Sequence, residues 1–349
     1  MAPLLEIRDV DRRFYHDKLE DFLPDQIIDV HTHVWLKDFR RIPPTGRAAA
    51  WPLRVAEQGP IGELVETYRL LFPGKSVMPV AFSFVESCDD DFDSANAYVS
   101  RAAREHRFPA LVFASPRWSA ARLEQEIREG GFVGVKVYLT LAASHIAADQ
   151  IRIFDFLPHH QLEVLDQHHW IVMLHIPRAG RLRDPANLTD MLEVECCYPN
   201  AQVIIAHVGR AYCPEDVGDA FAALAQTERL LFDISANTNA AVFEQLIRAV
   251  GPQRILFGSD LPITRMRMRR ICENGAYVNL VPRGLYGDVS DDRHMREVDG
   301  EQAEALSFFL YEEIDAFRRA ARAAGLTARD VKDVFHDNAT RIVKRAGGQ

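Results

Sequence analysis

Eight short apolar runs alternate with amphipathic stretches along this chain, and this alternation restricts the fold more than any other feature of the sequence. The runs that we expect to form strands are 27–33, 76–84, 109–115, 132–139, 171–176, 202–208, 230–236 and 255–260. Several are almost continuously hydrophobic, as strands covered on both faces are. Patterns with helical spacing lie between and after them, over 60–72, 92–106, 118–129, 158–169, 185–197, 214–227, 239–250, 302–324 and 328–345.

Strands that alternate with helices in this way predict an α/β protein with a (β/α)8 barrel. A doubly wound sheet is the competing arrangement, but it normally carries a Gly-rich phosphate-binding turn after an early strand, and the sequence shows none. We expect residues 25–349 to form the barrel domain and residues 1–24 an N-terminal extension that wraps the barrel or contacts another subunit. Residues 264–300 follow the last strand and predict a long insertion that acts as a lid.

The composition is that of an ordinary globular protein. The 349 residues are 48% hydrophobic and 26% charged, with a formal net charge of −9, which argues against a general attraction to nucleic acid or to anionic membranes. No apolar run approaches the ~20 residues needed to span a bilayer. The N-terminus carries acidic residues early and lacks the pattern of a signal peptide. We therefore expect a cytoplasmic protein with no membrane or nucleic-acid partner.

The cysteines give the same expectation. There are five of them, an odd number, and no CxxC motif occurs. This usage favours reduced thiols in a cytoplasm over a disulfide framework. The five are Cys88, Cys196, Cys197, Cys213 and Cys272.

Two histidines end the first apolar run. They are His31 and His33 in the sequence Asp-Val-His-Thr-His. On a strand the side chains alternate between faces, so these two imidazoles point the same way. Two imidazoles on one side of a strand end are poor core residues and good metal ligands.

Four later runs carry further polar residues at or near their ends. Lys136 lies in the fourth run, His175 ends the fifth, His207 ends the sixth and Asp260 ends the eighth. In a barrel the catalytic groups lie at the C-terminal ends of the strands, and closure brings the eighth strand beside the first. Asp260 is therefore expected to approach the first histidine pair. Three imidazoles and one carboxylate suit Zn²⁺ and also accept Fe²⁺, Mn²⁺ or Co²⁺.

Five motifs on successive strands resemble the amidohydrolase superfamily, specifically its amidohydrolase-2 branch. They are DVHTH, GFVGVKVY, MLHIPR, IIAHVGR and LFGSDLP. The resemblance runs from about residue 27 to a final helix at 331–343, where VFHDNATRIV looks like the usual closing helix of that branch.

The resemblance implies a distorted TIM barrel with a divalent metal at its mouth. By carry-over, His31, His33 and His175 would bind one metal, with Zn²⁺ as the first choice and Mn²⁺, Fe²⁺ or Co²⁺ as alternatives. Asp260 would be a ligand, a general base or both. His207 in such enzymes either binds a second metal or orients and protonates the substrate, and we favour the second, catalytic role.

Other residues near the predicted mouth are candidates for binding substrate. In binuclear relatives a lysine at the position of Lys136 is carbamylated and bridges two metals, whereas an unmodified lysine holds a substrate carboxylate or forms a structural ion pair. Arg178 and Arg210 either bind an anionic substrate or form salt bridges at the rim. Trp35 either lines the pocket or packs in the core. The cluster Arg265–Arg270 could cover an anionic group, although we expect most of its members to be solvated.

The sequence leaves three functions open. The first is a metal-dependent hydrolase that acts on a small, anionic ester, lactone or amide. The second is a metal-dependent decarboxylase, or hydratase, of an aromatic or unsaturated carboxylic acid. The third is a barrel that binds a ligand without catalysis. In each case we expect a small-molecule partner and a homodimer.

Overall fold

The computed structural model describes residues 4–39, 54–85 and 87–348. Its barrel strands are β1 (Gln26–His33), β2 (Ser76–Phe82), β3 (Val112–Phe113), β4 (Gly134–Val137), β5 (Ile171–Leu174), β6 (Gln202–Ile205), β7 (Leu231–Asp233) and β8 (Ile255–Leu256). Each overlaps one of the apolar runs, so the predicted order of strands is confirmed.

The barrel is distorted because its strands do not form one continuous ladder. β3 to β8 pair in sequence order as a parallel six-stranded sheet, and β1 pairs with β2 in a separate two-stranded sheet. Single parallel bridges join the two sheets, at Ala81–Ala110 on one side and Thr32–Leu261 on the other. The second seam brings Asp260 beside β1, since its N–H donates to the carbonyl of His31 at 2.8 Å. The predicted distorted TIM-barrel architecture is confirmed.

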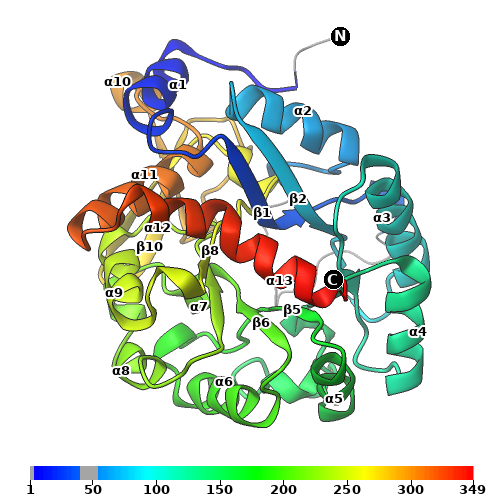
Figure 1. Ribbon diagram of the computed structural model, residues 1–349. Helices are drawn as coiled ribbons and strands as arrows, with labels where there is room; N and C mark the ends of the chain where they lie inside the picture. Colours follow the sequence, from blue (N-terminus) through cyan, green and yellow to red (C-terminus); the bar gives the residue numbers. More distant parts are fainter. Residues whose placement is uncertain (1–3, 40–53, 86, 349) are drawn as a thin grey trace.

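Helices cover the outside of the strands (Figure 1). They are α2 (Ile61–Leu71), α3 (Phe92–His106), α4 (Ala120–Gly130), α5 (His159–Gln167), α6 (Pro185–Cys197), α8 (Ala220–Leu224), α9 (Ala240–Val250) and α11 (Phe309–Ala323). Side-chain oxygens cap several of their N-termini, which satisfies backbone N–H groups that have no partner inside the helix. The capping residues are Asp91 for α3, Ser119 for α4, Asp184 for α6 and Asn239 for α9.

The last helices close one end of the barrel. These are α12 (Ala328–Lys332) and α13 (Asn338–Ala346), whereas α10 (Gly300–Glu304) lies apart from the barrel strands and contacts Ala276–Pro282 of the insertion that follows β8. A π-helical turn over Asp333–Asp337 joins the last two, and its Val334 carbonyl accepts from the N–H of Phe257 at 3.0 Å. Figure 1 shows α13 running across the strands, and it contacts β1, β5 and β8.

The N-terminal segment packs against the insertion that follows β8. It contains α1 (Asp9–Phe14) and a π-helical turn over Tyr15–Leu19, while residues 1–3 of the expected extension lie outside the described residues. Asp11 is buried and accepts hydrogen bonds from both terminal nitrogens of Arg267, at 2.9 and 2.7 Å. The hydroxyl of Ser307 also donates to it, at 2.7 Å. A contact of this segment with another subunit stays a prediction.

The insertion is more regular than a loop. It forms a small sheet of β9 (Arg269–Glu273), β10 (Ala276–Pro282) and β11 (Met295–Val298), in the order β11-β10-β9. The expectation that most of the cluster Arg265–Arg270 is solvated is wrong, because Arg265, Arg267 and Arg270 are buried and only Arg269 of the four arginines is exposed. Ion pairing explains two of the three, since Arg265 lies 3.3 Å from Glu63 and Arg267 binds the acidic side chain of α1.

A disulfide joins the insertion to the barrel, and it corrects the expectation of five reduced thiols. Cys213 and Cys272 are bonded, with their Cα atoms 5.8 Å apart. The fold brings together two positions 59 residues apart, which cysteine spacing alone does not reveal. Cys88, Cys196 and Cys197 remain free.

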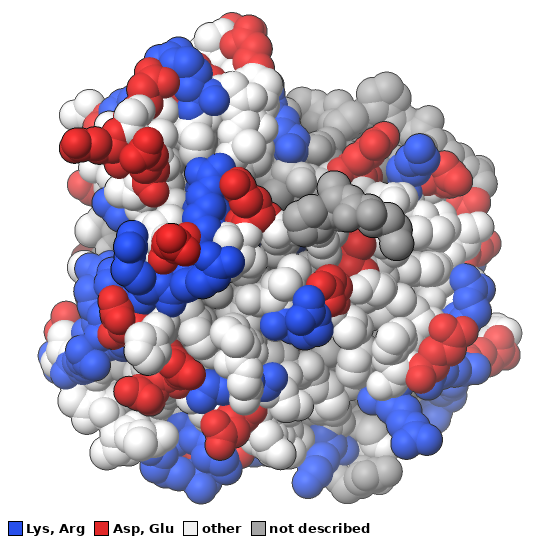
Figure 2. All heavy atoms as spheres, turned by 90° about the horizontal axis from the view of Figure 1, so that it is seen from above, with Lys and Arg blue, Asp and Glu red and all other residues white. Residues whose placement is uncertain are grey.

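The surface carries charges of both signs. On the face seen in Figure 2, Lys and Arg side chains are interspersed with Asp and Glu, so the electrostatic field there does not have a single sign. Across the part of the chain that the structure describes, no helix has the length and apolar composition that a bilayer span requires.

Candidate metal centre

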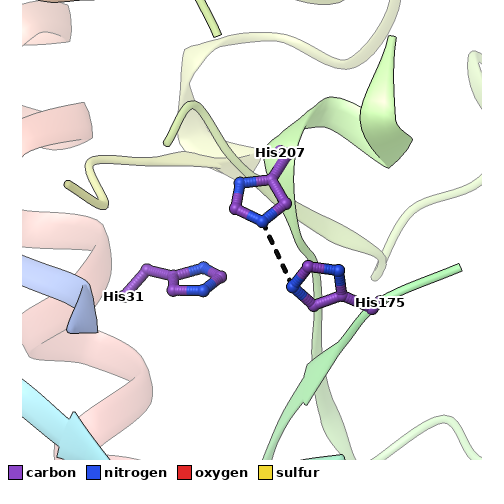
Figure 3. A group of neighbouring side chains, drawn as sticks. All are labelled: His31, His175 and His207. Carbon is purple, nitrogen blue, oxygen red and sulfur yellow. Dashed lines mark hydrogen bonds between the residues drawn. The ribbon is translucent and has the colours of Figure 1, made fainter. Parts of the chain in front are cut away.

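Five sequence-predicted side chains come together where the parallel strands end. His31 and His33 lie at the end of β1, and His175, His207 and Asp260 follow β5, β6 and β8. Figure 3 shows the rings of three of these histidines, from β1, β5 and β6, pointing toward one another. The convergence follows from the barrel, in which all these strand ends meet at one rim.

The ligand atoms form two overlapping groups. The first contains His31, His175 and His207, the second contains His31, His33 and Asp260, and within each group the atoms lie within 4.8 Å of one another. The Nε2 atoms of His175 and His207 are 3.1 Å apart. Asp260 Oδ1 lies 3.3 Å from Nε2 of His33 and 3.6 Å from Nε2 of His31. His31 therefore stands between the two groups.

The other ring nitrogen of three of these histidines is held by a hydrogen-bond acceptor. The pairs are His31 Nδ1 with Asp233 Oδ2 at 2.8 Å, His207 Nδ1 with the Ser235 carbonyl at 2.9 Å, and His33 Nδ1 with the Ser83 carbonyl at 3.3 Å. A carbonyl oxygen can only accept, so in a neutral ring the proton sits on Nδ1. The Nε2 lone pairs then face the centre, as in histidines that bind a metal.

The charges at the centre point to a cation. Burial, aided by the nearby Lys136, lowers the pKa of His31 to about 3 and that of His175 well below its ordinary value, so both rings are neutral. Burial raises the pKa of Asp260, but its contact with His33 and the nearby imidazoles outweigh this and hold the pKa at about 2. Neutral nitrogen lone pairs and a carboxylate thus converge, and a divalent metal is the partner that such a donor set fits.

Asp233 is a site residue that the sequence analysis missed. Besides orienting His31, its Oδ1 accepts from the backbone N–H groups of His207 and Ser235, at 2.8 and 3.1 Å. It therefore fixes two histidines of the site that come from different strands. The available signal was an aspartate that ends a run, 230–236, which is otherwise mostly apolar.

The backbone at two site residues lies in the left-handed region. His207 has φ of 56° and Asp260 has φ of 58°. The segment α7 (His207–Arg210) is in fact a left-handed turn, since Val208 and Gly209 also have positive φ. For residues other than glycine such conformations cost about 1–3 kcal/mol each and cluster at functional sites.

Lys136 lies at the edge of the same centre. Its Nζ is 3.4 Å from Nε2 of His31 and 4.8 Å from the ring centroid of Phe82. Burial lowers its pKa to about 7, against the opposing effect of Asp260 and Asp233. The amine is thus placed to contact a group bound at the histidines.

The remaining candidates are engaged with the protein itself. Arg178 donates to the carbonyls of residues 151 and 150, at 3.1 and 3.2 Å. Arg210 donates to the carbonyls of residues 176 and 177, at 3.3 and 3.1 Å. Trp35 is fully buried, and its indole N–H donates to the Glu57 carbonyl at 3.1 Å. A role in substrate binding stays a prediction for all three.

Comparison with known proteins supplies a family. The model of a family described as Amidohydrolase matches residues 28–345 of the chain. No curated protein sequence matches this chain significantly.

Solved structures share the fold at low sequence identity. A probable 2-pyrone-4,6-dicarboxylic acid hydrolase from Acinetobacter baumannii, solved with citric acid, has a TM-score of 0.57 and 14% identity, covering 91% of this chain and 98% of that one. A zinc-bound amidohydrolase from Burkholderia multivorans has a TM-score of 0.56 and 14% sequence identity, covering 91% of this chain and 99% of that one. A 5-carboxyvanillate decarboxylase from Novosphingobium aromaticivorans, solved with manganese, has a TM-score of 0.52 and 14% sequence identity, covering 92% of this chain and 96% of that one.

Proposed function

This chain belongs to the amidohydrolase family, and we propose that it is a metal-dependent hydrolase of a small, anionic ester, lactone or amide. One observation carries the proposal. Four histidines whose Nε2 atoms converge face an ionised carboxylate at one rim of the barrel, and this donor set fits a divalent cation.

The position of each site residue suggests its role. We assign His31, His33 and His175 to holding the metal, together with Asp260. A divalent metal bound here would supply a Lewis acid that polarises a carbonyl and lowers the pKa of bound water toward ~7. Asp260, being ionised, accepts a proton from the attacking water and returns it to the leaving group. His207, with its Nδ1–H committed to a carbonyl, presents Nε2 to the reacting groups, where the neutral ring orients the substrate as an acceptor and protonates it only after taking up a proton itself.

A decarboxylase, or hydratase, of an aromatic or unsaturated acid is the second candidate. Aromatic rings border the histidines and favour a flat substrate. The ring of Phe82 lies 4.7 Å from that of His33, and the ring of Tyr138 lies 4.7 Å from that of His175, centroid to centroid. The manganese-bound relative from Novosphingobium aromaticivorans is itself a decarboxylase.

Two measurements test these proposals. Metal analysis of the purified protein is expected to give about one equivalent of a divalent ion, zinc first, with manganese, iron or cobalt as the alternatives. Candidate lactones, esters, amides and aromatic acids are then supplied, while acid release and CO2 are followed in parallel. Acid release without CO2 supports the hydrolase. CO2 from an aromatic acid, with no ester, lactone or amide turned over, would show that the decarboxylase is correct instead.

Partner and location stay predictions. A small-molecule substrate follows from the proposed chemistry, and light scattering in solution tests the predicted homodimer. The cytoplasmic location rested partly on reduced thiols, and the disulfide between Cys213 and Cys272 removes that support.

A further inference from the structure

Arg270 is a buried arginine with no acidic partner among the described residues. It is 9% exposed, as is Arg265, and Arg267 is 4% exposed. Arg265 and Arg267 each have a carboxylate oxygen within 4 Å, at 3.3 and 2.7 Å, whereas Arg270 has none in the part of the chain that the structure describes. An arginine does not lose its proton in a protein, so this guanidinium is a buried positive charge without a carboxylate in direct contact, and the charge of Asp260 acts on it only from beyond 4 Å.

The protein holds this guanidinium in place without neutralising it. Nε donates to the side-chain oxygen of Asn279 at 2.8 Å, and one terminal nitrogen donates to the Ala236 carbonyl at 2.6 Å. The rings of Tyr212, Tyr277 and Phe309 surround it, with centroids 4.8, 4.4 and 4.5 Å away. Cation–π contacts offset part of the cost of burial. The second terminal nitrogen makes no hydrogen bond to any described residue, so donors remain for a ligand.

A cavity of about 260 Å³ opens beside Arg270. Tyr212 and Cys272 line one part of it, and Arg319 of α11 lines another, with 54% of its side chain exposed. Ala240 and Ala241, the first two residues of α9, also line the cavity. Their N–H groups have no partner inside the helix, and the helix macrodipole places partial positive charge there.

A buried guanidinium and a helix N-terminus therefore place positive potential at one cavity. A second guanidinium, that of Arg319, lies at the rim, where Asp315 partly neutralises it at 3.3 Å. We propose that this cavity is a binding site for a small oxyanion, a carboxylate or a phosphate group, with Arg270 as its main determinant. A planar guanidinium with free donors suits either group. The site lies next to the metal centre, since the ring of Tyr212 is 6.5 Å from that of His207, but it uses none of the proposed metal ligands.

The chain supplies a matched control for this site. Arg269 precedes Arg270 in β9, so its side chain points to the other face of the strand, where it is exposed and lies 3.2 Å from Glu312. Arg269→Gln and Arg270→Gln remove the same charge from adjacent positions, and only the second removes it from the cavity.

The test is the melting temperature of the full-length protein, titrated with acetate, inorganic phosphate or neutral acetamide at constant ionic strength. We expect a saturable rise with at least one anion, and the comparison of the two anions identifies the preferred group. Acetamide is expected to have no such effect. Arg270→Gln is expected to weaken the apparent affinity about tenfold or more, and Arg269→Gln to leave it within about twofold. The rise is expected to persist in EDTA, because no metal is involved.

Three results would overturn the proposal: no saturable rise with either anion, equal loss in the two variants, or loss of the effect in EDTA, which would place the anion on the metal. If the Arg270→Gln variant does not fold, the Arg319→Gln variant tests the proposal instead. The side chain of Arg319 is half exposed, so its removal does not open the core. A weakening of about threefold or more supports the site, and an unchanged affinity refutes it. These readouts do not involve turnover, so they stand apart from the proposed hydrolase.

Discussion

Asp260 has the burial and charge that a general base at this centre needs. It lies within 3.6 Å of two imidazole nitrogens, and its pKa of about 2 keeps it ionised at neutral pH. Asp260→Asn preserves the volume and removes the charge. We expect this variant to keep part of its metal and to lose a factor of ~10² or more in kcat. Metal analysis and steady-state rates on the same preparation check this, and a near-normal rate would exclude Asp260 as the base.

The buried carboxyl of Glu313 is expected to make the free energy of unfolding depend on pH. Burial raises the pKa of this carboxyl well above its ordinary value of 4.5, and the nearby carboxylates of Asp29, Asp233 and Asp260 add to the rise. The hydrogen bond that Oε2 accepts from the Ala236 N–H at 2.7 Å opposes it, and Oε1 has no partner among the described residues. Above pH 4.5 the unfolded chain gives up this proton and the folded chain keeps it. The stability that the raised pKa contributes is therefore full below that pH and is lost as the pH rises.

Glu313→Gln removes this dependence. Between about pH 5 and 8 we expect the free energy of unfolding to fall with rising pH less steeply in the variant than in the wild type. The two slopes are expected to differ by up to about 1.4 kcal/mol per pH unit. Denaturant titrations in EDTA at several pH values measure the slope. Glu304→Gln, at an exposed position of α10, is the control and should leave it unchanged. Parallel slopes for wild type and Glu313→Gln would mean that the buried carboxyl ionises at an ordinary pH.

At the scale of elements, the disulfide ties β9 to the turn that follows β6. It closes a long segment, 59 residues from one cysteine to the other, and such a link constrains the unfolded chain. Replacing both Cys213 and Cys272 by serine is expected to cost about 2–4 kcal/mol of stability under non-reducing conditions. Cys196→Ser, which removes an exposed free thiol, is the control. Three titratable thiols are expected in denaturant without reductant, and a count of five would contradict the bond.

The strands of the barrel could be predicted from sequence because each falls in a short, mostly apolar run. The histidines and Asp260 at the rim could be predicted because each ends such a run. The small sheet of the insertion could not, since β9 reads Arg-Arg-Ile-Cys-Glu and carries neither an apolar run nor a clean alternation. Burial of Arg267 depends on a partner in α1, more than two hundred residues away. Asp233 was missed for a similar reason, because an aspartate within an apolar run gives no sign of which histidine it orients.

At the scale of the whole molecule, one buried ion pair joins the first helix to the insertion. The side chains of Asp11 and Arg267 are 0% and 5% exposed. Removing one partner of a buried pair leaves the other charge uncompensated, so Asp11→Ala is expected to cost about 3–5 kcal/mol of unfolding free energy. Asp9→Ala breaks an exposed pair with Arg12 in the same helix and should cost well under about 1 kcal/mol. Similar unfolding midpoints for the two variants would show that the extension does not stabilise the fold.

That ion pair also orders events during translation. Asp11 leaves the ribosome 256 residues before Arg267, an interval of roughly 13–50 s at about 5–20 residues per second. Through that time the carboxylate lacks its guanidinium partner, although the N–H of Arg8 in the same segment can donate to it. The segment that is synthesised first is therefore among the last to dock. A nascent chain interrupted before Arg267 exposes both the helix and an incomplete barrel rim.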